Sequence, residues 1–327
     1  MLKDIFIALY AIYSVILYTP FFTKDNIQKV SKKLQHFQKG KQENNEKIII
    51  KGVNEVNYEI FVRPLSLGPP RVNQVVGGSK WVIRYRLVES LTTFTPPDLD
   101  LFDPQVAYLP MQIVTVIRLL SNFDSITDIG PLAPPIDDFS TYQVIEQQWK
   151  TSQHYAQLQE IFTAIEIPFT LTKVIALALG SLIVRSRINK SRFLQHALVS
   201  ALHSALVHRG ILPVSSEKYV QDPAYAQRDK DLIHSAGFTV LNDPQAWLEL
   251  DESSVLVSIN ADVLVGDIVA DICRPGIIIW DDRARSDSFP PVGQRVKEMI
   301  ENEYSEISFP DYDNCFRRMV ILIKKCT

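Results

Sequence analysis

The run Val174-Ile175-Ala176-Leu177-Ala178-Leu179-Gly180-Ser181 decides the fold of this chain. Its first six residues are all apolar, which is typical of a strand buried on both faces of a sheet. Gly180 then allows a tight turn, because glycine adopts backbone angles that other residues avoid. We therefore predict a buried strand over 174–179 that ends in a loop.

Apolar and helical segments alternate from this strand to the C-terminus. This alternation predicts an α/β fold, a Rossmann-like and mainly parallel sheet with helices on both faces. The last two strands are close in sequence, so we expect an antiparallel hairpin at the sheet edge. The expected strands are 174–179, 211–215, 238–241, 254–259, 276–280, 306–309 and 318–323, and the expected helices are 192–209, 223–236, 265–272, 293–303 and a short one after Asp243-Pro244.

The chain divides into three parts by composition. Residues 1–91 are expected to form a smaller α+β region with two helices and an antiparallel sheet. Proline is concentrated in residues 92–140, which we predict to be a linker or excursion with one short helix at 111–120. Residues 141–327 carry the Rossmann-like domain, which begins with a helix over 142–165. The elements expected in the first part are a helix capped by Thr23, with Ile27, Val30, Leu34 and Phe37 at helical spacing, and extended segments at 47–53, 58–65 and 81–88.

Charge and glycine content exclude two classes of function. The net charge of −3 gives no electrostatic signal for a nucleic-acid binder. Only 12 of the 327 residues are glycine, which is too few for glycine-rich loops that cradle phosphates. The GxGxxG, Walker A, HExxH, GxSxG and CxxC patterns are also missing. The sequence therefore predicts no dinucleotide cradle, and it identifies no cofactor and no catalytic residue.

Polar residues follow several of the expected strands, at the edge where α/β sheets bind ligands. Gly180 would let the backbone approach a phosphate or an adenosyl group, and Ser181 could donate a hydrogen bond. Asp222 could hold a ribose, although an aspartate before Pro223 is also an ordinary helix start. The other polar residues could equally cap helices or pair with nearby arginines. The candidate ligand pocket consists of Gly180, Ser181, Asp222, Asn260, Asp262 and Asp281.

Two histidines share one face of the long helix expected over 192–209. His196 and His203 are two turns apart, about 10 Å along the axis, which is too far for one metal ion. We expect them on a partly exposed polar face. Haem or metal ligation is the alternative.

The N-terminus contains an uncharged stretch from Ile5 to Phe22 with lysine-rich sequence after it. Its 18 residues reach the length of a membrane helix. Pro20, however, ends a helix near Tyr18, about 14 residues from its start and short of the ~20 needed to span a bilayer. We therefore favour a buried helix over membrane association or a signal peptide. The three cysteines form no disulfide framework and fit a cytoplasmic or nuclear setting.

Four motifs within residues 173–282 belong together: the 174–181 run, Gln195-His196-Ala197, Gln221-Asp222-Pro223-Ala224-Tyr225 and the segment 268–281. With these motifs, residues 173–282 resemble the domain family named for plant "sensitivity to red light reduced" proteins, in its fungal form. The resemblance implies a regulatory protein, linked to light and clock signalling in plants and to cytoskeletal stability or haem metabolism elsewhere, with no defined catalytic activity. Plant members carry Pro-His-Cys where this chain has Asn260-Ala261-Asp262. The N-terminal Leu9-Tyr10, Tyr18-Thr19-Pro20 and Phe22-Thr23-Lys24 are also similar to fungal relatives.

Two function hypotheses follow. The first is a regulatory protein without a conventional catalytic site, because no complete catalytic motif is present. The second is a binder of an adenosyl-type ligand, or a methyltransferase-like enzyme, that uses Gly180, Ser181, Asp222 and Asn260. The expected partner is another protein or a small adenosyl-type ligand, and a membrane-associated adaptor is a third, less favoured hypothesis.

Overall fold

A computed structural model describes the chain in two compact units. The first comprises Met1–Ile129 with Gly266–Ile272, and the second comprises Gly130–Val265 with Cys273–Thr327. The sequence-based boundaries near 91 and 140 stay predictions. The residues that the structure describes are 20, 22–38, 47–51, 57–61, 74–85, 111–121, 138–184, 187–259, 261, 265–281, 293–310, 316 and 319–326.

The described residues of the first unit form helix α2 (Lys24–Gln38), two antiparallel strand pairs and the helical segment Gly266–Ile272. Helix α2 begins where the Thr23 hydroxyl accepts a hydrogen bond from the Asn26 amide at 3.2 Å. Its apolar residues Ile27, Val30 and Leu34 are buried, as helical spacing predicts. Strand β1 (Lys47–Lys51) pairs with β2 (Asn57–Phe61), and β3 (Gln74–Tyr85) pairs with β4 (Met111–Ser121).

The helix expected at 111–120 is wrong, because this segment forms strand β4. Five of its residues, from Ile113 to Ile117, are β-branched, and β-branched side chains favour extended backbone. Pairing with β3 then fixes the strand. The extended segment expected at 81–88 overlaps β3, which already begins at Gln74.

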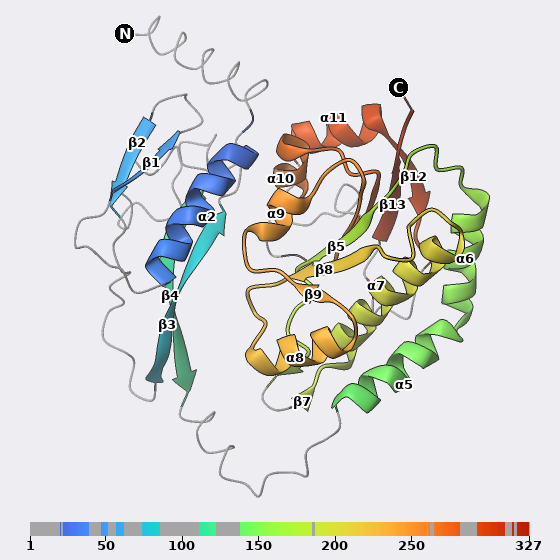
Figure 1. The fold of residues 1–327 in the computed structure, drawn as a ribbon, viewed down its shortest axis with the longest axis horizontal. Coiled ribbons are helices and arrows are strands. Elements are labelled where there is room, and N and C mark those ends of the chain that lie inside the picture. Colours follow the sequence, from blue (N-terminus) through green and yellow to red (C-terminus); the bar gives the residue numbers. More distant parts are fainter. Residues whose placement is uncertain are drawn as a thin grey trace, which may run out of the picture. The chain divides into compact units, whose positions relative to one another are not determined.

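A seven-stranded mixed sheet forms the centre of the second unit (Figure 1). Its strand order is β12-β13-β11-β10-β5-β8-β9. The five strands from β11 to β9 are parallel, and β13 runs antiparallel to both β11 and β12. The α/β class and the antiparallel edge hairpin are therefore confirmed. The strands are β5 (Lys173–Leu177), β8 (Glu217–Gln221), β9 (Thr239–Val240), β10 (Ser254–Ser258), β11 (Ile277–Asp281), β12 (Tyr304–Ser308) and β13 (Met319–Lys324).

Both faces of this sheet are buried. Val174 and Ala176 on β5 belong to one large cluster, while Ile175 and Leu177 point to the opposite face and are equally shielded from solvent. The chain moves from β5 to β8 and β9 in one direction and from β10 to β11 in the other. Right-handed crossovers then place the first helices on one face and the later α11 on the other. The helices of the unit are α5 (Asp138–Lys150), α6 (Gln153–Ala164), α7 (Lys190–His208), α8 (Gln227–Ser235), α9 (Gln245–Glu249) and α11 (Gln294–Glu303), and α10 (Val265–Ile272) connects β10 with β11.

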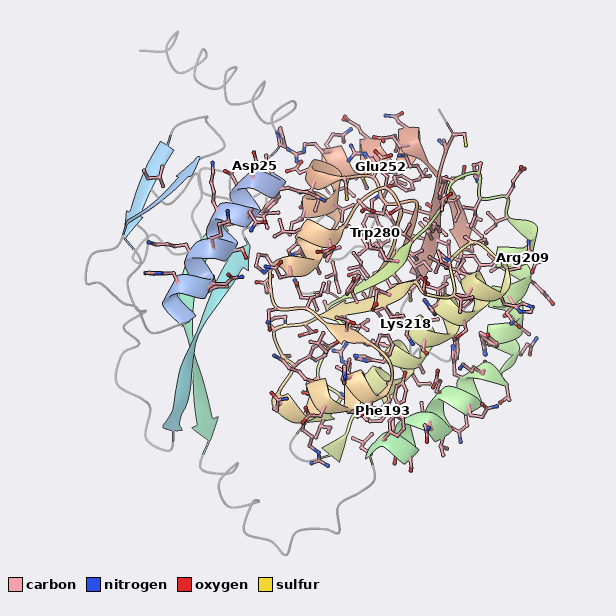
Figure 2. All side chains as sticks on the ribbon, viewed as in Figure 1. Asp25, Phe193, Arg209, Lys218, Glu252 and Trp280 are labelled. Carbon is pink, nitrogen blue, oxygen red and sulfur yellow. The ribbon has the colours of Figure 1, made fainter. Side chains whose placement is uncertain are left out.

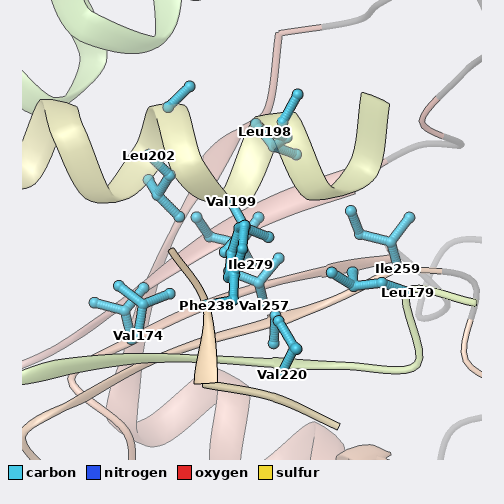
Figure 3. Close-up of a cluster of buried hydrophobic side chains, with 14 of the residues drawn as sticks. Val174, Leu179, Leu198, Val199, Leu202, Val220, Phe238, Val257, Ile259 and Ile279 are labelled. Atoms are coloured by element: carbon cyan, nitrogen blue, oxygen red, sulfur yellow. The ribbon is translucent and has the colours of Figure 1, made fainter. Parts of the chain in front are cut away.

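Helix α7 supplies the apolar layer over one face of the sheet. Val199 and Leu202 project toward the side chains of the parallel strands (Figure 3). Side chains from both layers fill the interior of the unit (Figure 2). Helix α5 packs along α7 on its outer side, with the Tyr142 and Phe193 rings 5.9 Å apart. This core holds the carboxyl ends of the strands, and hence the loops beyond them, in fixed positions.

Two further predictions need correction. The helix expected over 142–165 is two helices, α5 and α6, because Ser152 caps a new helix by accepting the Tyr155 amide at 3.2 Å. The strand expected over 211–215 is a turn that closes α7, and the strand β8 begins at Glu217. Leu212 of this turn is buried in the core while Val214 is 88% exposed, so the apolar run covers the end of α7 without forming a strand.

The apolar N-terminal stretch lies largely outside the described residues. No described helix has the length and hydropathy to cross a membrane. At the end of the stretch Phe22 is fully buried in the first unit, and its amide donates to the Asp271 carboxylate at 2.9 Å.

We expect Gly276→Ala to lower the free energy of unfolding by about 1–3 kcal/mol, the usual cost of overpacking. A Cβ at this position would lie 2.5 Å from Phe169 Cε2 and 2.7 Å from Leu171 Cδ2. Urea unfolding measures the loss. Combining Gly276→Ala with Phe169→Leu should recover part of it, and simple additivity of the two losses would contradict the steric explanation.

Candidate functional site

The reversal of strand order marks the place where a ligand site is expected. Strands β5 and β10 are neighbours, yet the chain leaves them in opposite directions across the sheet. In open α/β sheets, ligands bind outside the carboxyl ends of the strands at such a switch point. The loop that follows β5 therefore forms the centre of the candidate site.

Residues 178–181 leave β5 through an unusual turn. Ala178 has φ +59° and Gly180 has φ +75°, so two residues out of three adopt the left-handed conformation. For a residue with a Cβ, such as Ala178, this conformation costs roughly 1–2 kcal/mol. The Ala178 amide is held at 3.1 Å by the carbonyl of Gln221 on β8. Backbone strain of this kind is concentrated at ligand sites, although it is not restricted to them.

The Asp222 carboxylate connects this turn to the end of β8. Its Oδ2 accepts the Gly180 amide at 2.6 Å, and its Oδ1 accepts the Ala224 amide at 2.7 Å. Asp222 was expected to start a helix at Pro223, but α8 begins at Gln227, so this interpretation is wrong. The physical reason is that Asp222 binds locally to Ala224 and closes a turn instead. The sequence-predicted residues Gly180 and Asp222 are therefore in direct contact.

A second carboxylate, which the sequence analysis missed, anchors the rest of the loop. Asp229 on α8 is 1% exposed and accepts the Leu182 and Ile183 amides at 2.9 and 3.1 Å. It also accepts the Ala226 amide at 2.8 Å and the Ser181 hydroxyl at 2.9 Å. An aspartate at the third position of a helix is typical of a capping residue, and Asp229 holds this position in α8. The sequence analysis did not recognise it because it predicted the helix start at Pro223. Ser181 is thus engaged with Asp229 and with the Ile183 carbonyl at 2.8 Å.

The Arg192 side chain lies directly against Gly180. A Cβ on Gly180 would be 2.6 Å from Arg192 Nε and 2.9 Å from Cζ. The guanidinium donates to Gln195 Oε1 at 3.0 Å, one turn further along α7. Gln195 is 1% exposed. The Arg192 cation and the Asp222 carboxylate therefore both lie against Gly180 in the turn after β5.

His196 is buried in the core, so the prediction of a partly exposed position is wrong. Its Nδ1 lies 2.7 Å from the Arg192 carbonyl, and its Nε2 lies 2.9 Å from the Tyr225 hydroxyl. Burial lowers the pKa of this imidazole to about 4. It is therefore neutral at pH 7, with both nitrogens engaged. The physical reason for the misplacement is that Tyr225 supplies a partner that lets a polar ring be buried.

We expect the stability of the protein to fall by about 2 kcal/mol between pH 7.5 and pH 5 through His196 alone. The folded-state pKa lies below the unfolded-state value, so the unfolded chain takes up the proton first. The contribution is complete above about pH 6.5 and is lost as the pH falls toward about 4. Urea midpoints of wild type and His196→Gln measure it. An equally steep pH dependence in both proteins would contradict this assignment.

The remaining candidates lie elsewhere or outside the described residues. His203 bonds to the Ser216 hydroxyl at 2.8 Å and does not meet His196. Asp281 ends β11, two strands from β5 and so about 10 Å away along the sheet. Asn260 and Asp262 are not among the described residues. Within the described part of the chain, no group of three His, Cys, Asp or Glu side chains has the geometry of a metal site.

The comparison with protein families assigns the region around the turn after β5 to a known domain family. The model of the SRR1 domain matches residues 158–318, from within α6 to the residue before β13. Residues 158–318 form an SRR1 domain. The resemblance found in the sequence is thereby confirmed at the level of the family. Ala178, Gly180, Arg192, Asp222 and Asp229 all lie inside the SRR1 domain.

Other comparisons add little. A crystal structure titled Thermoplasma acidophilum 1320 is similar to 57% of this chain over 98% of its own length, with 11% sequence identity and a TM-score of 0.30. No curated protein matches the chain.

In the SRR1 domain, the backbone after β5 differs from that of a dinucleotide-binding cradle. In such a cradle, the helix after the first strand begins at the turn and points its amide groups at the pyrophosphate. Here the short strands β6 (Ile183–Val184) and β7 (Arg187–Ile188) pair between the turn and α7. Helix α7 starts only at Lys190. Its N-terminus therefore does not begin at Gly180.

Proposed function

We propose that this SRR1 domain is a regulatory domain that binds an adenosyl-type ligand at the carboxyl edge of its sheet. It acts in the cytoplasm or nucleus and catalyses no conventional reaction. The observation that carries the proposal is the contact between the Gly180 amide and the Asp222 carboxylate at 2.6 Å. It fixes an acidic group beside the turn after the first strand, where Rossmann-like folds bind a ribose. Each carboxylate oxygen keeps a free lone pair, so Asp222 can accept ribose hydroxyls while it holds the turn.

The side chains near the turn support binding more than catalysis. A general base needs an accessible nitrogen or oxygen atom near the reacting proton. Both nitrogens of His196 are engaged inside the core, and the Ser181 hydroxyl donates to Asp229 rather than to a base. These contacts leave Gly180, Arg192 and Asp222 as binding groups.

A methyltransferase is the second candidate function, and the strand order favours it. Numbered along the chain, the seven strands have the order 3-2-1-4-5-7-6, with the seventh antiparallel to its neighbours. Methyltransferases that use adenosylmethionine share this order, which is an analogy at the level of the fold only.

A thermal-shift panel tests the binding proposal. We expect adenosylmethionine and adenosylhomocysteine at 100 times their Kd to stabilise the protein by about 2.7 kcal/mol. NAD, NADP and haem should leave the melting temperature unchanged, because within the described residues α7 begins away from the turn after β5, and His196 and His203 are engaged with separate partners. A panel in which neither adenosyl ligand raises the melting temperature would remove the basis of the proposal.

Turnover separates the two functions. The regulatory proposal predicts that purified protein with adenosylmethionine produces no adenosylhomocysteine above the rate of an Asp222→Ala variant, with protein or small-molecule methyl acceptors present. Production of more than one adenosylhomocysteine molecule per protein molecule would overturn the regulatory proposal in favour of a methyltransferase.

A further inference from the structure

Arg192 and Gln195 stand next to each other on α7, beside the turn that carries the proposed site. The Arg192 guanidinium lies against Gly180, and one of its NH groups donates to Gln195 Oε1 at 3.0 Å. Because α7 begins at Lys190, both side chains belong to its first two turns. The pair is thus rigidly placed by the helix that packs on the sheet.

Both side chains keep donors that the described residues do not use. Guanidinium has five N–H donors, and only the one to Gln195 has a partner within the described residues. No carboxylate in the described part of the chain lies within ion-pair distance of it. Gln195 is 1% exposed, and its Nε2 has no hydrogen-bond partner there. A buried amide donor without a partner is costly, so it indicates a group that completes it.

The charges around the pair select the kind of group. One guanidinium and one neutral amide fit a singly charged, planar carboxylate, which accepts two parallel hydrogen bonds. Asp222 and Asp229 stand around the same turn, and their negative charge disfavours a doubly charged phosphate. The same two carboxylates favour a positive charge elsewhere on the ligand.

We propose that the ligand of this site is an adenosyl compound with an amino-acid tail, whose carboxylate binds the Arg192 guanidinium and the Gln195 amide. The inference rests on the proposed function and adds to it the class of substituent that the nucleoside carries. The ammonium of the tail faces the acidic side of the turn, where Asp222 holds the Gly180 amide.

Calorimetric titration with three related compounds tests this inference on the full chain. Adenosylhomocysteine carries the amino-acid tail, methylthioadenosine lacks it, and AMP replaces it with a phosphate. We expect wild type to bind adenosylhomocysteine at least tenfold more tightly than either of the others. In Arg192→Gln this preference should shrink to less than threefold, while methylthioadenosine binds as in wild type.

Two variants serve as controls for folding and for charge. Gln195→Met removes the amide donor, and with it the Oε1 acceptor of Arg192, in nearly the same volume while it keeps the guanidinium charge. It should lose part of the preference even where Arg192→Gln is too unstable to titrate. Arg209→Gln changes the same residue type at the other end of α7, where the side chain donates to the Thr163 carbonyl at 3.0 Å. It should leave all three affinities unchanged.

The outcomes separate this inference from the proposed function. Equal affinity for adenosylhomocysteine and methylthioadenosine overturns the carboxylate assignment but leaves adenosyl binding intact. Tighter binding of AMP overturns it in favour of a phosphate ligand. Absence of binding by all three compounds overturns the proposed function itself, and the inference with it.

Discussion

Replacing Asp229 with alanine is expected to lower the free energy of unfolding by about 3–5 kcal/mol. The carboxylate is 1% exposed and accepts three backbone amides and the Ser181 hydroxyl. Alanine would leave these donors buried without an acceptor, and each such group costs about 1–3 kcal/mol before the structure relaxes. The loss belongs to the class of large effects that single substitutions rarely reach.

The same helix offers a matched control. Asp231 is exposed and pairs only with the Gln227 side chain, at 2.8 Å, so Asp231→Ala should cost less than about 1 kcal/mol. Urea unfolding at pH 7.5 compares the two variants. If Asp229→Ala lowers the free energy of unfolding no more than Asp231→Ala does, the Asp229 carboxylate does not anchor the loop after β5.

Replacing Gly180 with alanine is expected to weaken binding of adenosylhomocysteine at least tenfold. Gly180 has φ +75°, and an added Cβ would lie 2.6 Å from Arg192 Nε. The side chain of Arg192 would have to move away from the turn, and a positioning error of this kind removes a charge-assisted contact to the ligand. Alanine in the left-handed conformation also costs roughly 1–2 kcal/mol of stability.

Gly210 separates the two effects of this substitution. It has φ +72°, and a Cβ there would meet nothing within 4 Å. Gly210→Ala should therefore lose the same 1–2 kcal/mol of stability as Gly180→Ala, yet bind adenosylhomocysteine as wild type does. Equal binding by both variants, measured by calorimetric titration, would show that Gly180 serves the fold and not the ligand.

The sequence predicts the sheet well, because most of its strands are continuous apolar runs. Residues 254–259 and 276–280 are such runs, and the structure places β10 and β11 there within about one residue. Strand β8 is an exception, because it begins with Glu217, which is exposed, and Lys218, which is only partly buried. The apolar run at 211–215, which closes α7, has a more strand-like sequence pattern than β8 and was therefore predicted as the strand.

The candidate site was predictable only in part, because its contacts depend on partners distant in sequence. Gly180 and Asp222 were found, since residues at strand ends have a position that the alternation of elements predicts. Asp229 was missed because the start of its helix was predicted at residue 223, four residues before the observed start of α8. Arg192 was missed because its contact with Gly180 joins residues that are distant in sequence. The burial of His196 depends on Tyr225, 29 residues further along the chain, which no local pattern indicates.

Calorimetric titration of adenosylhomocysteine into wild type and Asp222→Ala tests the central claim most directly. The account predicts one binding site per chain in wild type and an affinity at least tenfold lower in Asp222→Ala, because the ribose loses its acceptor and the turn loses its tie to β8. Asp231→Ala should match wild type. No binding by wild type, or binding that Asp222→Ala leaves unchanged, would contradict a ligand site at the carboxyl edge of β5 and β8.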